Sequence, residues 1–333
     1  MTLNLIIQRA GSNLNGKRKG QEMKEDIENV SISIVIPTHN RHDLLMNLLD
    51  SIRKFAIKQL KEIIIVDDST DQDEINFGID VKVIHVKLKD RIFISKAKNI
   101  GWKLASSRLV FFIDDDNRID KDTLYGTLKI FLENDNIGAA MPSVLYHRNR
   151  NLVWVYATPF SGNRWGHELI GRNMPRNPLL EGKMYDVDAL PNASLIPLEV
   201  LKMTGGFDEN LKINSSGTIT MRIKKLGMRA VATSGAFIYH DVALPGEFGL
   251  WAEHGISDPQ RVREEIVDWF TYMKSVHAGE KYFMIRALYH STAFLLPNIL
   301  SYVVIGNRNR TSLLRNVASG LTDVLRQKSH TRS

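Results

Sequence analysis

The sequence contains no cysteine, which excludes disulfides, thiolate zinc sites and cysteine nucleophiles. The first 30 residues lack the apolar run of a secretory signal peptide, so we expect the chain to be made and to remain in the cytoplasm. Basic residues are not interleaved with aromatic ones, and no zinc-knuckle or helix-turn-helix pattern occurs. Nucleic acid is therefore not an expected partner.

The composition is that of a folded chain. Of the 333 residues, 43% are hydrophobic and 24% are charged, which excludes a disordered chain and a polytopic membrane protein. The formal net charge is +7, and basic residues gather at both ends, where they suit an anionic surface. These residues are Lys17, Arg18, Lys19, Arg308, Arg310, Arg315, Arg326, Lys328 and Arg332. We expect residues 1–30 to form a flexible basic leader.

From Ser31 onward, short β-branched runs alternate with leucines at helical spacing. The predicted strands are 32–36, 63–66, 81–86 and 109–113, and the predicted helices are 43–55 and 95–105. This alternation predicts an α/β fold whose central sheet is mostly parallel, with helices on both faces. Polar residues follow three of the strands, at the edge where such sheets bind ligands.

The C-terminal part has a different pattern. Residues 287–307 contain no formally charged side chain and are long enough to span a bilayer. Polar residues dilute this stretch, so three readings stay open: a helix pair in the membrane interface, a span, or core helices. We expect residues 243–333 to form a helical, membrane-associating region. The basic flank from Arg308 favours anionic lipid at the cytoplasmic face, which predicts a peripheral membrane location.

Three consecutive aspartates, Asp114, Asp115 and Asp116, follow the last of these strands. Neighbouring carboxylates repel one another and raise one another's pKa unless a cation compensates. A hard divalent ion such as Mg²⁺ or Mn²⁺ is a natural compensator because it prefers oxygen ligands. A solvated acidic loop that caps the next helix fits these residues equally well.

Four blocks, in order, resemble glycosyltransferase family 2. They are Ile34-Val35-Ile36-Pro37-Thr38-His39-Asn40-Arg41, Val66-Asp67-Asp68-Ser69-Thr70, Lys98-Asn99-Ile100-Gly101 and Phe112-Ile113-Asp114-Asp115-Asp116. Weaker matches are Gly205-Gly206-Phe207-Asp208-Glu209, Arg222-Ile223-Lys224-Lys225-Leu226-Gly227 and Tyr239-His240. The resemblance implies a GT-A fold over residues 31–242 and an inverting transferase that uses a nucleoside-diphosphate sugar. Residues 282–323 loosely resemble rhamnosyltransferase-type members, which implies a lipid-linked or membrane-proximal glycan acceptor.

The resemblance also assigns roles to residues. The implied donor-binding residues are Pro37, Thr38, Asn40, Arg41, Asp67, Asp68, Arg91, Lys96, Asn99, Asp114 and Asp115, and the implied metal ligands are Asp114, Asp116 and His240. Within the acidic run, Asp114 is expected near the ribose, Asp116 on the metal, and the Asp115 side chain pointing elsewhere. Lys98 stands where most relatives carry arginine, so it keeps the charge but loses the bidentate fork.

One expected residue is missing. An inverting transfer needs a base, and the family carries it shortly before the arginine matched by Arg222, where residues 214–218 contain no carboxylate. Asp188, Asp208 and Glu209 are the candidate replacements. Alternatively the acceptor needs little base assistance, or the chain is a non-catalytic nucleotide-sugar binder. A nucleotidyltransferase is a further alternative, but it would carry a glycine-rich loop after the first strand, and residues 37–40 contain no glycine.

Overall fold

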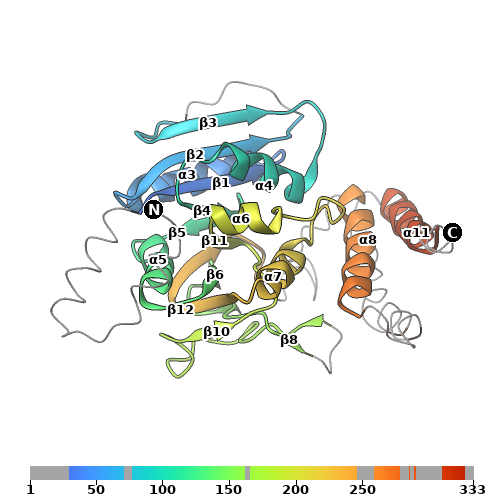
Figure 1. Ribbon diagram of the computed structural model, residues 1–333. Helices are drawn as coiled ribbons and strands as arrows, with labels where there is room; N and C mark the ends of the chain where they lie inside the picture. The colour runs from blue at the N-terminus through green and yellow to red at the C-terminus, as the bar shows by residue number, and fades with distance from the viewer. Residues whose placement is uncertain are drawn as a thin grey trace.

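A computed structural model describes residues 30–70, 77–161, 166–245, 259–277 and 310–326, together with residues 285 and 289. One mixed sheet dominates these residues, with strand order β10-β12-β6-β11-β4-β1-β2-β3; β5 pairs with β12 and β7 with β6 (Figure 1). The strands are β1 Ile32–Thr38, β2 Leu60–Asp67, β3 Lys82–Lys87, β4 Leu109–Ile113, β5 Asn117–Ile119, β6 Ile137–Tyr146, β7 Val153–Val155, β10 Met184–Asp186, β11 Ala193–Pro197 and β12 Arg229–His240. A separate hairpin joins β8 Phe160–Ser161 to β9 Gly166–His167.

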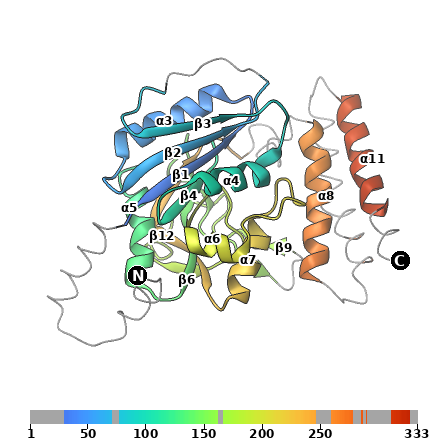
Figure 2. The ribbon, with the colours of Figure 1, turned by 45° about the horizontal axis from the view of Figure 1, so that its top comes forward.

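The first half of the sheet is parallel, as the sequence predicts. Strand β1 pairs in parallel with β2 and β4, and β2 pairs in parallel with β3. Helices α3 His42–Phe55 and α4 Phe93–Leu104 cover opposite faces of this half (Figure 2). Right-handed crossovers produce this arrangement, because the chain moves outward from β1 through β2 to β3 and then returns to the other side of β1 at β4. Every residue of β1 is buried, as expected for a strand covered on both faces.

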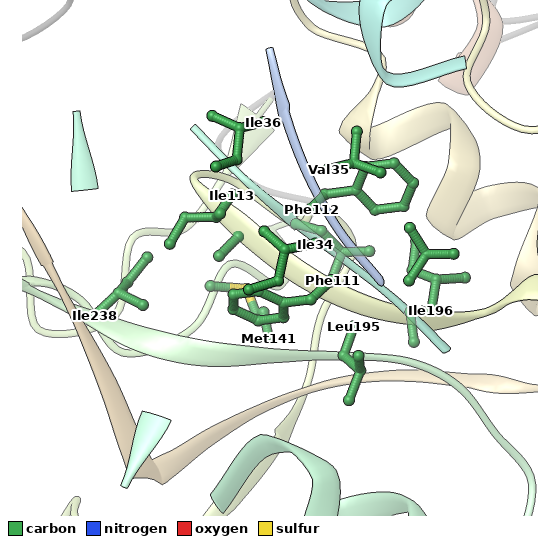
Figure 3. Close-up of a cluster of buried hydrophobic side chains, with 14 of the residues drawn as sticks. Ile34, Val35, Ile36, Phe111, Phe112, Ile113, Met141, Leu195, Ile196 and Ile238 are labelled. Carbon is green, nitrogen blue, oxygen red and sulfur yellow. The ribbon is translucent and has the colours of Figure 1, made fainter. Parts of the chain in front are cut away.

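The second half is mixed. Strand β11 runs antiparallel between β4 and β6, while β6 and β12 are parallel. Helices α5 Thr123–Glu133, α6 Leu198–Thr204 and α7 Ser216–Lys225 accompany these strands. Apolar side chains from both halves share one core, in which Ile34 and Phe111 lie near Met141, Leu195 and Ile238 (Figure 3). The two halves therefore form one α/β body, which confirms the predicted fold class.

Two helices among the described residues follow the sheet. Helix α8 Pro259–Val276 packs against α11 Arg310–Arg326. Gly320 of α11 allows the close approach, because a Cβ there would lie 3.2 Å from the carbonyl oxygen of Arg263. Among the described residues, no helix combines the length and apolarity that crossing a membrane requires. The apolar stretch 287–307 and the leader up to residue 29 lie outside the described residues, and membrane association of the C-terminal region stays a prediction.

Candidate active site

A cleft of about 470 Å³ opens where β1, β2 and β4 end, within the ~300–1,000 Å³ typical of ligand pockets. It is lined by Pro37, Thr38, His39, Asn40, Arg41, Asp68, Arg91, Phe93, Ile94, Ala97, Asp114, Asp115, Asp116 and Ile213. Most of the predicted donor-binding residues are in this set; Asp67, Lys96 and Asn99 are not. The carboxyl ends of the parallel strands thus bring the matched motifs together.

The three aspartates after β4 are paired with two cations. Arg41 Nη1 lies 2.8 Å from Asp116 Oδ2 and 3.1 Å from Asp115 Oδ1. Lys98 Nζ reaches Asp114 Oδ1 from helix α4, at 2.9 Å. These ion pairs join the loop after β4 to the loop after β1 and to α4. When all three carboxylates are ionised, they exceed the two paired cations by one negative charge, which a bound cation would offset.

Asp115 is the buried member of the cluster. It is 4% exposed, and Thr38 Oγ1 donates a hydrogen bond to its Oδ2 at 2.8 Å. Burial raises the pKa of Asp115 to about 7, although the charge of Arg41 opposes this. Burial also disfavours the charged form of Arg41. The negative charges of Asp115 and Asp116 together have the larger effect and raise the pKa of Arg41. Asp115 thus bonds to Thr38 at the end of β1 and shares Arg41 with Asp116. That its side chain points elsewhere than those of its neighbours stays a prediction.

Asp116 and His240 are the pair best placed to hold a metal ion. Asp116 Oδ1 lies 3.5 Å from His240 Nε2, and two adjacent ligands of an octahedral Mg²⁺ lie about 3 Å apart. Strand pairing brings them together, because Asn117 is opposite His240 in the sheet. Over the described ranges, no group of three or more His, Asp or Glu side chains is arranged to hold an ion. Two protein groups still suit Mg²⁺ or Mn²⁺, since such ions are often bound by one or two carboxylates with substrate phosphates and water.

Asp68 shapes the wall of the cleft. Its Oδ2 accepts hydrogen bonds from the amides of Ile92 at 2.6 Å and Phe93 at 3.1 Å, and its Oδ1 lies 2.9 Å from His39 Nδ1. These bonds start helix α4 at Phe93, two residues before the predicted start. Asp67 lies behind the cleft, where its oxygens accept from the Ser69 amide and face His85. Asp68 is therefore the acidic residue of this pair that lines the cleft.

The three predicted donor-binding residues in or next to helix α4 lie in different surroundings. Arg91, just before the helix, lines the cleft, and its guanidinium stacks on the Phe93 ring at 4.5 Å. Asn99 is 3% exposed and its amide nitrogen donates to the Phe207 carbonyl and to Glu209, so it joins α4 to the 205–209 segment. Lys96 is exposed outside the lining. Donor contacts by Asn99 and Lys96 stay predictions.

Sequence reasoning missed five lining residues: His39, Phe93, Ile94, Ala97 and Ile213. His39 lies inside a matched block, and that position was a usable signal in the sequence. The apolar residues carried no such signal, because their side chains read as ordinary helix or core positions. Ile213 comes from the segment between α6 and α7, far along the chain from the other lining residues.

None of the three candidate bases lines the cleft. Lys224 Nζ and the Phe160 amide contact the two oxygens of Asp188 at 2.5 and 2.7 Å. Burial alone would raise the pKa of Asp188, but these two groups outweigh burial and lower it. Asp208 accepts from Asn210 and faces Arg222 at 3.5 Å, while Glu209 accepts from Asn99. The identity of the base stays a prediction among these three.

The sequence and fold match known proteins. The family described as "Glycosyl transferase family 2" matches residues 33–186. "Polypeptide N-acetylgalactosaminyltransferase 8" of Drosophila melanogaster is 25% identical over 228 residues, covering 62% of this chain and 37% of the relative. "Minor teichoic acid biosynthesis protein GgaB" of Bacillus subtilis (strain 168) is 24% identical over 226 residues, covering 62% of this chain and 23% of the relative. The chain thus spans well under half of either relative's length.

The fold has solved counterparts. The crystal structure of GalNAc-T7 with UDP, GalNAc and Mn²⁺ superimposes with a TM-score of 0.53 at 17% identity, covering 80% of this chain and 58% of that chain. This likeness identifies the α/β body as a GT-A fold. The family match begins inside β1 and includes the motifs that meet at the cleft. Residues 33–186, which supply every lining residue of the cleft except Ile213, therefore match glycosyltransferase family 2.

Proposed function

We propose that the chain is an inverting glycosyltransferase that moves a sugar from a nucleoside-diphosphate sugar to a hydroxyl acceptor. One observation carries the proposal: the residues after β1, β2 and β4 converge on a single cleft that holds Arg41 and the acidic cluster. Lys98 and His240 contact Asp114 and Asp116 of this cluster from outside the lining. A strand-end cleft of this kind suits a ligand with a planar base and a charged diphosphate.

The residues along the cleft have different proposed roles. Asp68 and Arg91 flank the nucleoside end, where the remaining acceptor sites of the Asp68 carboxylate suit a base N–H. Asp116 and His240 would hold Mg²⁺ or Mn²⁺ beside the diphosphate. Such an ion, when bound, supplies Lewis-acid stabilisation of the leaving diphosphate. Arg41 and Lys98 hold the acidic loop in place, so that little reorganisation is needed when the donor enters.

The proposed acceptor is a glycan that is lipid-linked or close to a membrane. The teichoic acid role printed in the name of GgaB supports an acceptor of this class. The basic residues at the ends of the chain support contact with an anionic membrane surface, and hence a peripheral site at its cytoplasmic face.

A second function has one observation in its favour. No candidate base lines the cleft, so a nucleotide-sugar-binding protein without turnover fits the same geometry. Transfer and binding are separable by experiment, because a binder retains affinity for the donor but forms no product.

Calorimetric titration with UDP, GDP and dTDP, each with Mn²⁺ and with EDTA, tests the donor site. We expect one nucleotide to bind in the presence of Mn²⁺ and to lose most of its affinity in EDTA. Product formation from the matching nucleotide sugar then separates a transferase from a binder. Absence of binding for all three nucleotides would contradict the donor site itself.

A further inference from the structure

The C-terminal helix α8 inserts one carboxylate into the main body. Asp268 is 1% exposed, and its two oxygens accept hydrogen bonds from three consecutive backbone amides. These amides belong to Lys212, Ile213 and Asn214, at 3.1, 2.6 and 3.0 Å. Successive N–H groups that converge on one anion form a nest, which here is filled by the protein's own side chain. The chain between α6 and α7 reaches out to α8 at this point (Figure 1).

The far side of the same segment is fastened to helix α4. The Ser95 amide donates to the Lys212 carbonyl at 3.0 Å, and Ser95 Oγ bonds to the Leu211 carbonyl and to Ser215 Oγ. Ser95 is fully buried in the first turn of α4. The segment is thus held between α8 on one side and the start of α4 on the other.

This clamped segment forms part of the cleft. Ile213, whose amide makes the shortest bond to Asp268, lines the cleft together with Phe93 and Ile94 of the α4 first turn. Residues 214–218 are the stretch in which the sequence lacks a carboxylate. The structure places Asp268 beside the start of that stretch, although it lies 55 positions from Ile213 along the chain.

We propose that Asp268 is a positioning residue that fixes the 212–214 segment against α4 and so holds the wall of the donor cleft. The inference rests on the proposed donor site. Asp268 does not itself act as the base, because both of its oxygens are bonded to amides and the residue is 1% exposed. Packing reinforces the clamp: Tyr272 of α8 lies where a Cβ on Gly217 would be, with its hydroxyl oxygen 2.5 Å from that point. Helix α8 therefore supports the wall of the donor cleft without lining it.

The test compares Asp268→Asn with Asp323→Asn in the full chain. Asp268→Asn places an amide NH₂ against backbone N–H groups. Asp323→Asn weakens the Arg263–Asp323 pair between α8 and α11, which is 2.6 Å long and is linked to the segment only indirectly, through the Arg263–Glu264 and Glu264–Lys212 pairs. We expect Asp268→Asn to weaken the binding of UDP, GDP or dTDP with Mn²⁺ by about tenfold, well below the unfolding temperature of each variant. Asp323→Asn should bind as the wild type does, even where it lowers the unfolding temperature as much.

Hydrogen exchange distinguishes a positioning role of Asp268 from a general contribution to stability. The amides of residues 212–214 and of Ser95 should exchange faster in Asp268→Asn than in the wild type. In Asp323→Asn they should exchange at the wild-type rate. Equal effects of the two variants, or unchanged exchange at Ser95 in Asp268→Asn, would overturn the inference. If Asp268→Asn does not fold, Ser95→Ala cuts the same clamp from the α4 side and should weaken nucleotide binding. If the wild type binds no nucleotide, the proposed function fails, and exchange at Ser95 still decides whether Asp268 holds this wall.

Discussion

The two halves of the sheet use their carboxylates in opposite ways. In the first half, Asp115 is buried at the ligand edge and burial raises its pKa to about 7, so the protein carries an acidic cluster at an energetic cost. In the second half, burial also opposes the charge of Asp188, but Lys224 and the Phe160 amide overcome it and lower the pKa. Asp186 and Arg229 form another such pair at 2.9 Å.

This difference separates residues held ready for a ligand from residues that hold the fold. The three adjacent aspartates share two cations, so the protein offsets their mutual repulsion only in part. Asp186 and Asp188 each have a cation of their own. The first half therefore has the electrostatics of a binding site. The second half has those of a scaffold, and the predictions below test that contrast.

Replacement of Asp116 by asparagine should have the largest effect. We expect Mn²⁺-dependent nucleotide binding to be lost and transfer to fall by about 100-fold or more, because the substitution removes a charged metal ligand from beside the diphosphate. Asp186→Asn, at an exposed ion pair in the second half, is the matched control and should leave binding unchanged. Calorimetry with Mn²⁺ and with EDTA measures both. Retained Mn²⁺ dependence in Asp116→Asn would remove this residue from the metal site.

Adding a methyl group at a glycine probes packing in each half. A Cβ on Gly101 would lie 2.2 Å from Val35 Cγ1, so Gly101→Ala must push α4 away from β1. Overpacking of this kind costs about 1–3 kcal/mol in the free energy of unfolding. A Cβ on Gly235 in β12 would meet only Thr233 Oγ1, at 3.4 Å, and Gly235→Ala should change stability much less. Denaturant titration compares the two; equal losses would contradict the packing described here.

The pKa of Asp115 predicts a pH dependence. Its folded value of about 7 exceeds the ordinary value of 3.8, so between these limits the native state binds more protons than the unfolded state. The stability contributed by this group therefore falls as pH rises through that window. Asp115→Asn should lack this fall, and unfolding temperatures measured from about pH 4 to 7 in EDTA should show the difference. Parallel curves for the two proteins would mean that the Asp115 carboxyl is ionised throughout.

The sequence predicted the fold of the first half well, and the candidate site residues there follow their strands directly. Thr38, Arg41 and Asp116 stand at strand ends, and the parallel sheet brings such ends to one edge. Local sequence patterns could not predict contacts between segments that are far apart along the chain. The Lys98–Asp114 pair depends on how α4 lies on β4, and the bonds of Asp268 depend on a helix that packs 55 residues away in sequence. The metal ligands and the base stay predictions, and so does the membrane contact, because residues 287–307 lie outside the described residues.

Replacement of Asp188 by asparagine should have the smallest effect on transfer. Its lowered pKa makes it a weaker base than an unpaired carboxylate, and Lys224 and the Phe160 amide engage both of its oxygens. We expect Asp188→Asn to keep kcat within about tenfold of the wild type, since general-base catalysis is worth about 10²–10⁴-fold. Its measurable effect should instead be on stability, and only above about pH 4, because a lowered pKa stabilises the fold above the ordinary value of 3.8. A loss of kcat beyond about 100-fold in a folded variant would make Asp188 the base and would place catalysis in the second half of the sheet.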